Sequence, residues 1–325
     1  TREFNEVLTP NMFHNELILI KGARDFHFEL ISEALELKQH ETILEVNLDA
    51  LVHNLNSYRS QLQPDTKVVC MVKAFGYGAG SYEIAKTLQE HGVDYLAVAV
   101  ADEGAELRKA GITMPIIVMN PEISSFRTLF SYRLEPEIYS FNLLNALLAE
   151  GEKLGVSGYP IHIKIDSGMH RLGFTENQID ELANILQSQI VLMARSVFTH
   201  LAGSDEKVHD SYTQQQIATF TRCADVIQNA SKHKVLRHAL NTAGITRFPE
   251  HQMDMVRLGI GLYGISPMTT SQVLRPVSTL KTTILQIHEY ETGTTIGYGR
   301  NGILARPSRI AAIPIGYADG FDRRL

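Results

Sequence analysis

The sequence predicts an α/β fold, in which a (β/α)8 barrel of the TIM type is followed by a mostly β domain that is truncated at its C-terminus. Two observations support this prediction. From Lys67 onward, short Val/Ile/Leu-rich runs alternate with longer amphipathic segments, as in a parallel sheet with crossover helices. After Pro267 the pattern changes to Thr/Ile/Tyr-rich runs separated by glycine turns, which is typical of antiparallel strands. A doubly wound open sheet is the alternative to the barrel, because closure cannot be seen in a sequence.

The number of strands favours the barrel. The candidate strands are residues 67–73, 94–100, 115–119, 134–138, 161–165, 195–199, 235–240 and 253–258. Helical patterns between them include residues 81–91, 102–110, 141–153 and 210–228. A barrel of this type closes with eight parallel strands, which is the number found here.

One further strand precedes the barrel region, which we assign to residues 41–266. Residues 42–48 read as a strand before a helix that Asp49 would cap. Because the barrel already has its strands, we expect this extra strand to pair with the C-terminal β domain, residues 267–325.

The two ends of the chain are expected to be incomplete domains. Within residues 267–325, the runs 282–287 and 309–313 read as strands, but too few residues follow them to complete a sheet. Residues 1–40 contain one strand-like and one helix-like run, which cannot bury a core. We therefore expect a truncated β domain at one end and the tail of an upstream domain at the other.

The composition excludes several classes of function. The chain is 44% hydrophobic and 20% charged, as in an ordinary globular protein, and its formal charge of -6 argues against nucleic acid or an anionic membrane as partner. No apolar stretch reaches the ~20 residues needed to cross a bilayer. Cys70 and Cys223 are too few for a disulfide framework, so a cytoplasmic protein that binds small molecules is expected. No metal site is predicted.

Lys73 is the first candidate for chemistry. It ends the first apolar run, and the glycine-rich turn 74–80 follows at once. The last residue of a buried parallel strand emerges at the carboxyl rim, where α/β barrels place their chemistry. A partly desolvated amine there can form a Schiff base with a carbonyl or an aldehyde cofactor. A solvated lysine at a strand end is the alternative.

Tyr77 follows four residues after Lys73, at the start of the next predicted helix, where backbone amides favour an anion. A phosphate beside a Schiff-base lysine suggests pyridoxal 5'-phosphate. The alternative for Tyr77 is a half-buried packing residue.

A second polar cluster follows the fifth strand, at residues 164–174. Arg171 can fork onto a substrate carboxylate, and either Asp166 or a modified Lys164 can hold it in place. The alternative is a surface ion pair on a loop.

Two more segments fall on the same predicted rim. His200, after the sixth strand, can lie against a cofactor ring, or it can be a core-edge histidine with one backbone partner. Thr242 follows Asn241 after the seventh strand, opens a helix and can bind phosphate through its hydroxyl group.

The segment after the eighth strand contains G-x-G-x-x-G at residues 259–264. A dinucleotide oxidoreductase is disfavoured, because that motif should open a βαβ unit and be followed by an acidic ribose ligand. Loops after strands seven and eight of barrels often bind phosphate, so Gly259 and Ile260 share this role with Thr242. Arg257, inside a buried strand, needs a specific partner, and a pyridine nitrogen is one.

The predicted β domain contributes two tyrosines beside glycines. Tyr298 lies between Gly297 and Gly299, which exposes it, and Tyr317 follows Gly316. Tyrosines in such positions are usually turn residues, so a function for them requires a link to the barrel.

Taken together, these segments resemble alanine racemases, pyridoxal-phosphate enzymes with an N-terminal (β/α)8 barrel and a C-terminal β domain. Phe75 and Ala79 replace the more usual Asn and His of the family's cofactor-lysine motif, whereas Lys73 and Tyr77 are retained. The matching motifs occur in the family's order, at residues 72–78, 166–173, 199–202, 241–244, 256–264 and 297–299.

The resemblance implies racemisation of L-alanine and D-alanine by two bases on opposite faces of the substrate, which supplies D-alanine for peptidoglycan synthesis. Lys73 would carry the cofactor and act on one face, and the partner subunit's Tyr298 would act on the other face in a homodimer. Arg257 would contact the pyridine nitrogen, and Arg171 the substrate carboxylate.

The same resemblance implies roles for the remaining candidates. Lys164 occupies a position that is carbamylated in some members, and Tyr317 would line the entrance. The other cofactor contacts would come from Tyr77, His200, Asn241, Thr242, Gly259 and Ile260. A non-catalytic barrel carrying pyridoxal phosphate and a racemase for another small amino acid such as serine are the alternatives, since alanine and serine differ by one hydroxyl group.

The first forty residues resemble the end of the ligase that adds D-alanyl-D-alanine to the UDP-N-acetylmuramoyl tripeptide. Residues 18–24 match its closing strand and turn. This resemblance implies a parent protein that fuses the ligase to the racemase.

Overall fold

The computed structural model describes residues 13, 18–21, 31, 35, 42–266 and 273–322. The chain divides into two compact units. The larger is Val46–Thr279, and the smaller combines Thr1–Glu45 with Leu280–Leu325. Most of the ligase-like segment predicted for residues 1–40 lies outside the described residues.

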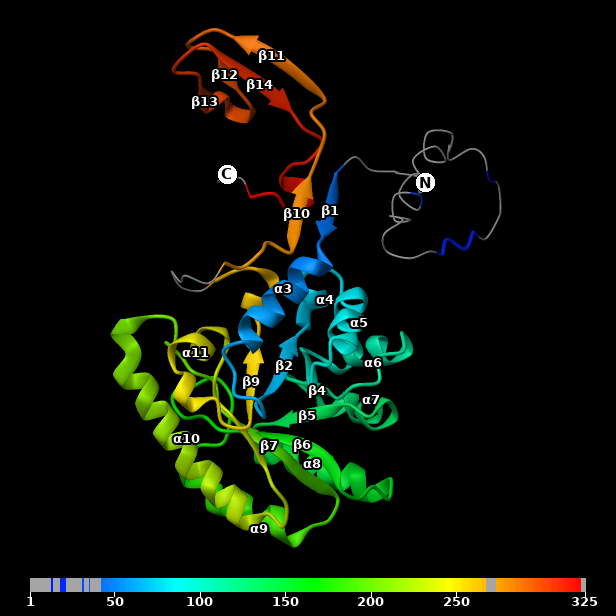
Figure 1. Cartoon of the computed structure of the whole chain (residues 1–325), viewed down its shortest axis with the longest axis vertical. Coiled ribbons are helices and arrows are strands. Elements are labelled where there is room, and N and C mark those ends of the chain that lie inside the picture. The colour runs from blue at the N-terminus through cyan, green and yellow to red at the C-terminus, as the bar shows by residue number, and fades with distance from the viewer. Residues whose placement is uncertain are drawn as a thin grey trace. The chain divides into compact units, whose positions relative to one another are not determined.

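The larger unit is built on an eight-stranded parallel sheet (Figure 1). Its strands are β2 (Lys67–Met71), β3 (Tyr95–Val98), β4 (Ile116–Val118), β5 (Glu135–Ile138), β6 (Tyr159–Lys164), β7 (Leu192–Phe198), β8 (Leu236–His238) and β9 (Met255–Leu258). The order β8-β7-β6-β5-β4-β3-β2-β9 places the first and last of these strands side by side.

Two backbone hydrogen bonds join the remaining edges of the sheet, at β8 and β9. The N–H groups of Asp254 and Arg257 donate to the carbonyl oxygens of Arg237 and Leu240, at 3.2 and 3.0 Å. The sheet therefore curls into a nearly closed barrel. The predicted barrel is confirmed, and the open doubly wound sheet is excluded.

Helices connect successive strands. The long ones are α3 (Leu48–Arg59), α5 (Tyr82–Glu90), α6 (Ala101–Lys109), α7 (Phe126–Tyr132), α8 (Phe141–Lys153), α9 (Ile179–Ser188) and α10 (Asp210–Ala230). Shorter turns are α4 (Lys73–Tyr77), η3 (Ile123–Ser125), η4 (Glu176–Gln178), η5 (Lys207–His209), α11 (Thr242–Arg247), η6 (Pro249–His251) and η7 (Ile260–Tyr263). Within the described residues, no helix is long and apolar enough to cross a bilayer.

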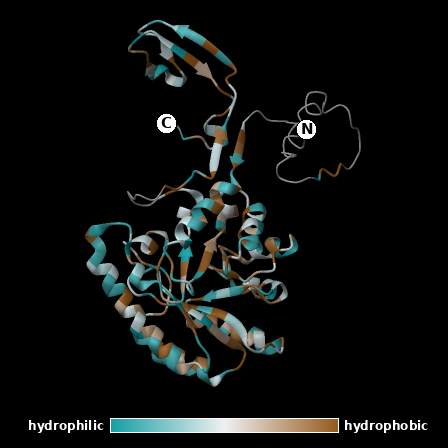
Figure 2. Ribbon diagram, viewed as in Figure 1, coloured by the Kyte–Doolittle hydropathy of each residue, from teal (hydrophilic) through white to brown (hydrophobic). Residues whose placement is uncertain are grey.

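Strand side chains alternate between two apolar layers. Val69, Tyr95 and Ile117 belong to a small cluster inside the barrel, whereas Val68 and Cys70 belong to the large core beneath the helices. Hydrophobic and hydrophilic residues also alternate along the helix α10, as the brown and teal segments of Figure 2 show. Each fully buried Val or Leu side chain contributes roughly 1.5–3 kcal/mol, so these layers hold the strand ends in fixed positions.

The cap of α3 differs from the prediction. The Oδ1 atom of Asn47 accepts a hydrogen bond from the backbone N–H of Ala50 at 2.8 Å, so Asn47 and not Asp49 is the N-cap. Asp49 instead lies in the first helical turn, where its negative charge favours the helix dipole.

The smaller unit contains antiparallel pairs. β11 (Gln286–Tyr290) pairs with β14 (Ser308–Ala312), and β12 (Thr295–Ile296) pairs with β13 (Gly302–Ile303). Two short turns follow strands, η8 (Tyr298–Arg300) and η9 (Tyr317–Asp319).

The extra strand of the sequence is β1 (Ile43–Val46), and it pairs with β10 (Ser278–Lys281). The single strand predicted over residues 282–287 is wrong, because β10 ends at Lys281 and β11 begins at Gln286. Strand formation requires a neighbour, and β1 and β14 provide neighbours to the two sides of this segment but not to its middle.

Candidate active site

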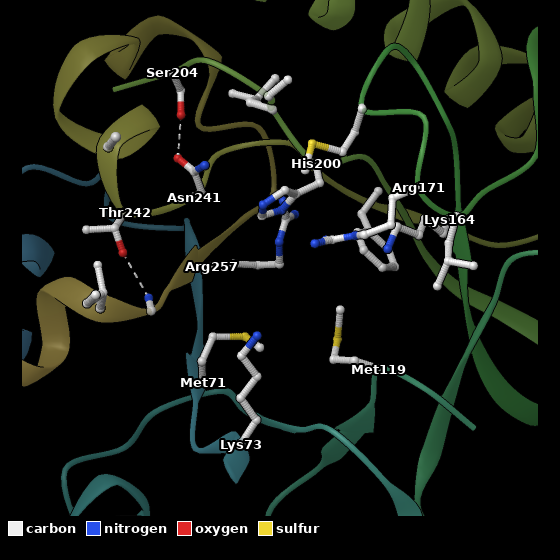
Figure 3. A pocket seen from close by; sticks show the side chains of 18 of the residues that line it. Met71, Lys73, Met119, Lys164, Arg171, His200, Ser204, Asn241, Thr242 and Arg257 are labelled. Atoms are coloured by element: carbon white, nitrogen blue, oxygen red, sulfur yellow. Dashed lines mark hydrogen bonds between the residues drawn. The ribbon is translucent and has the colours of Figure 1, made fainter. Parts of the chain in front are cut away.

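A cavity of about 590 Å³ lies in the larger unit, at the carboxyl ends of the strands (Figure 3). Most of the predicted site residues line it: Lys73, Tyr77, Lys164, Arg171, His200, Asn241, Thr242, Arg257, Gly259 and Ile260. Tyr298 and Tyr317 lie in the smaller unit, where their side chains are exposed. Among the described residues, no group of three or more His, Cys, Asp or Glu side chains is placed to hold a metal ion.

Lys73 does not end the strand as predicted. β2 ends at Met71, and Lys73 opens a turn whose next four residues have positive φ angles: Ala74 (53°), Phe75 (51°), Gly76 (64°) and Tyr77 (55°). A left-handed turn costs a non-glycine residue roughly 1–2 kcal/mol, so the surrounding contacts must hold it.

Glu103 on α6 provides one of these contacts. Its two carboxylate oxygens accept hydrogen bonds from the backbone N–H groups of Phe75, at 3.3 Å, and Ala99, at 2.7 Å. This carboxylate therefore ties the turn to the end of β3. The result is that Lys73 points into the cavity, with Arg171 extending toward it from another wall (Figure 3).

Two hydroxyl groups converge at one end of the cavity. The backbone N–H of Gly259 donates to Thr242 Oγ1 at 3.0 Å, and a Cβ atom added at Gly259 would lie 3.5 Å from Tyr77 Oη and 3.6 Å from Thr242 Oγ1. Asn241 caps α11, because its Oδ1 accepts from Gly244 N and from Ser204 Oγ (Figure 3). Hydroxyl groups fixed in this way are suited to a phosphate.

Gly261 is expected to be essential to the packing beside Thr242, at the end of the cavity where the two hydroxyl groups converge. A Cβ atom there would lie 2.4 Å from Tyr58 Oη and 2.6 Å from Thr242 Cγ2. Gly261→Ala should lower the free energy of unfolding by about 1–3 kcal/mol, measured by urea denaturation. Gly316→Ala is the control, since a Cβ atom there meets nothing within 4 Å. Equal stability of the two variants would contradict this packing argument.

Arg257 is 4% exposed, and its guanidinium group makes four hydrogen bonds. It donates to His238 Nδ1 (3.0 Å) and to the carbonyl oxygens of His238 (3.1 Å), Thr199 (2.6 Å) and Ala239 (2.9 Å). Burial lowers the pKa of Arg257 to about 10, and Glu137 acts in the opposite direction, so the guanidinium group stays charged at neutral pH.

A buried chain of polar side chains continues from Arg257 across the barrel interior. His238 Nδ1 accepts from Arg257, so its proton lies on Nε2 and is donated to Ser196 Oγ at 2.9 Å. Ser196 can then donate to His162 Nδ1 at 2.6 Å, and His162 Nε2 donates to Glu135 at 2.9 Å. These contacts fix the position of the Arg257 guanidinium group.

Comparison with known proteins identifies the family of this barrel and pocket. Residues 46–267 match the family described as alanine racemase, N-terminal domain, and residues 277–325 match alanine racemase, C-terminal domain. The chain belongs to the alanine racemase family.

Individual relatives agree with this assignment. Alanine racemase 2 of Caldanaerobacter subterraneus subsp. tengcongensis is 38% identical over 87% of this chain and 74% of its own length. The solved structure of alanine racemase from Clostridium difficile 630 has a TM-score of 0.79 and 35% identity, over 87% of this chain and 75% of that one. The biosynthetic alanine racemase of Pseudomonas aeruginosa has a TM-score of 0.78 and 30% identity, over 88% of this chain and 78% of that one.

In this alanine racemase pocket, His200 lies near Arg257 (Figure 3). Burial lowers the pKa of His200 to about 3, and the positive charges of Arg257, Arg171, Lys164 and Lys73 act in the same direction. The imidazole is therefore uncharged at neutral pH.

The depressed pKa of His200 predicts loss of stability in acid. Its folded pKa of about 3 lies below the ordinary 6.5, so the unfolded chain binds more protons between these values. The contribution of His200 to the free energy of unfolding is complete above pH 6.5 and decreases as the pH falls toward 3. Urea denaturation across this range should show a shallower decline for His200→Asn. Parallel curves for the two proteins would show that His200 is not a source of the pH dependence.

The loop after β6 differs from one of the predicted arrangements. Asp166 does not hold Arg171, because its carboxylate accepts hydrogen bonds from Gly168 N (3.1 Å), His170 N (2.9 Å) and His170 Nδ1 (3.2 Å). These three bonds lower the pKa of Asp166 against the effect of its burial. Asp166 therefore shapes the loop that carries Arg171.

Sequence reasoning missed several residues that this alanine racemase barrel brings together. Lys164 Nζ lies 2.8 Å from Glu137 Oε1, and both side chains are buried. The missed residues are Glu135, Glu137, His162, Ser196 and His238. A signal was present, because charged and polar residues recur at alternate positions of predicted strands, as in Glu135/Glu137 and His162/Lys164.

Proposed function

We propose that this protein interconverts L-alanine and D-alanine with pyridoxal 5'-phosphate as cofactor. The observation that carries the proposal is the placement of Lys73, Arg257 and the hydroxyl groups of Tyr77 and Thr242 around one cavity, in a chain of the alanine racemase family. A primary amine, a buried guanidinium group and two converging hydroxyl groups are what an aldehyde, a pyridine ring and a phosphate need.

The residues present fit this cofactor. The space that a Cβ atom at Gly259 would enter lies between Tyr77 Oη and Thr242 Oγ1, which leaves the glycine backbone able to approach a phosphate closely. Tyr77 and Thr242, with Gly259, Ile260 and Asn241 beside them, would hold the phosphate. Arg257 would face the pyridine nitrogen, and His200 would lie beside Arg257 as a neutral group.

Two proton-transferring groups are needed for racemisation. Pyridoxal phosphate, when bound, withdraws electrons from the α-carbon of the amino acid and so makes its proton acidic. Lys73 would move the proton on one face of the substrate, and the partner subunit's Tyr298 would move it on the opposite face. The exposed position of Tyr298, at 89%, is compatible with a role outside its own subunit.

Substrate orientation would come from Arg171. Its guanidinium group lines the cavity and extends into it (Figure 3), so it can fork onto the carboxylate of alanine. Tyr317 of the partner subunit would line the entrance.

Proton exchange tests the proposed activity. Protein incubated with pyridoxal phosphate should absorb visible light and exchange the α-proton of both alanine enantiomers in deuterated water, followed by NMR. A protein that binds the cofactor without exchange would instead be a non-catalytic carrier. Faster exchange with serine than with alanine would reassign the substrate.

A mixing experiment tests the homodimer. Lys73→Ala and Tyr298→Phe should each be nearly inactive alone. If Tyr298 acts in the partner's site, a mixed dimer contains one site with neither lesion, so an equimolar mixture that exchanges subunits should recover about a quarter of the wild-type activity. No recovery despite subunit exchange, shown by differently tagged chains, would place both residues in the same subunit's site.

We place the barrel at residues 41–266 and the β domain at 267–325, with β1 as the additional strand of the β domain. A cytoplasmic location is supported by the buried free thiols of Cys70 and Cys223. D-alanine from this reaction would serve peptidoglycan synthesis. The ligase-like tail of residues 1–40 and the fused parent protein remain predictions from sequence.

A further inference from the structure

Glu137 has an unusual environment for a carboxylate. It lies on β5, is 0% exposed and lines the cavity. Within the described part of the chain, neither of its carboxylate oxygens has a hydrogen-bond partner of good geometry, although Lys164 Nζ lies 2.8 Å from Oε1. A buried carboxylate without such partners is retained only where nearby charges stabilise it.

Three cations surround Glu137. Burial raises the pKa of Glu137 on balance, and the positive charges of Lys164, Arg257 and Arg171 act against that rise. Of the described residues that line the cavity, only Glu137 and Asp205 are acidic, and Asp205 is exposed. Glu137 is therefore the one buried carboxyl group among these cavity-lining side chains, and Lys164 Nζ is the basic group in contact with it.

We propose that Glu137 is the internal anion of this site, which holds Lys164 in a buried ion pair at 2.8 Å and so prevents its carbamylation. The proposal concerns only this pair and does not rest on the proposed function.

The chemistry of carbamylation explains the exclusion. The lone pair of a neutral lysine amine attacks the carbon of CO₂, an N–C bond forms while one C=O π bond opens, and the amine releases a proton. An ammonium ion has no lone pair to offer. A carbamate on Lys164 would also put a second buried negative charge beside Glu137, and neighbouring carboxylates resist joint ionisation.

Carbon-13 NMR tests this assignment. The protein with bound pyridoxal phosphate is equilibrated with ¹³C-bicarbonate, and the lysine carbamate signal is sought. The wild-type protein should show none. Glu137→Gln keeps the shape but removes the charge, so Lys164 loses its counter-ion and a carbamate signal should appear. Glu137→Asp keeps the charge and should remain without signal.

The controls make each outcome decisive. The double variant Glu137→Gln, Lys164→Met should lose the new signal, which assigns it to Lys164. If circular dichroism shows that Glu137→Gln does not fold, Glu137→Thr serves as a second uncharged variant for the same carbamate measurement. A carbamate in the wild-type protein, or none in the folded neutral variant, would overturn the proposal. Because the signal does not depend on turnover, an inactive protein with the expected spectra would reject the proposed function alone.

Discussion

Lys73→Ala is expected to abolish the visible absorption of bound pyridoxal phosphate and to slow alanine racemisation by roughly 10⁴-fold or more. The physical reason is that the variant loses both the covalent attachment point and the proton-transferring amine on one face of the substrate. Alanine cannot replace either, because it has no polar atom beyond the backbone. Absorbance spectra and α-proton exchange in deuterated water measure the two losses separately.

The matched control for Lys73 is Lys67, the first residue of β2, the strand that precedes Lys73. Lys67 pairs with Asp94 at 3.0 Å, and its side chain is 44% exposed. Such a pair contributes little, so Lys67→Ala should retain the spectrum and most of the activity. Full exchange activity in Lys73→Ala would show that another group carries the cofactor. Equal losses in both variants would indicate damage to β2 and not to the chemistry.

Arg257→Leu is expected to lower the free energy of unfolding by several kcal/mol. The change leaves His238 Nδ1 and the buried carbonyl oxygens of Thr199 and Ala239 without this donor. The carbonyl oxygen of His238 also loses a bond but still accepts from the backbone N–H of Thr199. Each unsatisfied buried group costs about 1–3 kcal/mol, and partial relaxation reduces the sum. Thermal unfolding should show a lower midpoint, by roughly 2–4 °C for each kcal/mol in a unit of this size.

Two further variants show whether the loss of stability in Arg257→Leu comes from the hydrogen-bond geometry of arginine or from its charge. Arg257→Lys keeps a positive charge but cannot form the same fork of hydrogen bonds, so its loss should be intermediate. Arg222→Ala removes an exposed arginine that pairs with Glu176 and should leave the midpoint unchanged. If Arg257→Leu were as stable as Arg222→Ala, the hydrogen bonds of Arg257 would not support the barrel.

The barrel was predictable because most of its strands and helices have clear sequence patterns of their own, and these patterns alternate along the chain as a (β/α)8 barrel requires. The strands β2, β3, β4, β7 and β9 are mainly apolar runs, and α8 has the same limits, 141–153, in the prediction and in the structure. Closure was not predictable, since it depends on the seam hydrogen bonds from Asp254 and Arg257 to residues about 17 positions earlier. A period of two along a strand does not show which strand lies beside it.

A candidate residue was predictable where a charged side chain interrupts or directly follows an apolar segment of the sequence. Arg257 lies within an apolar strand, and Lys73 lies between an apolar run and a glycine-rich turn. The left-handed turn after Lys73 was not predictable, because Ala74 and Phe75 have no preference for positive φ and are held there by contacts with Glu103 and other distant residues.

The sequence by itself determined that this chain is an α/β barrel protein with a reactive-lysine motif and an arginine in an apolar strand. Only the tertiary structure decided that Glu137 meets Lys164 and that His162, Ser196 and His238 connect Glu135 to Arg257. The physical reason is that side chains on neighbouring strands are brought together by barrel curvature and register. Those are properties of the packed sheet, and a polar residue in one strand does not reveal its partner in the next.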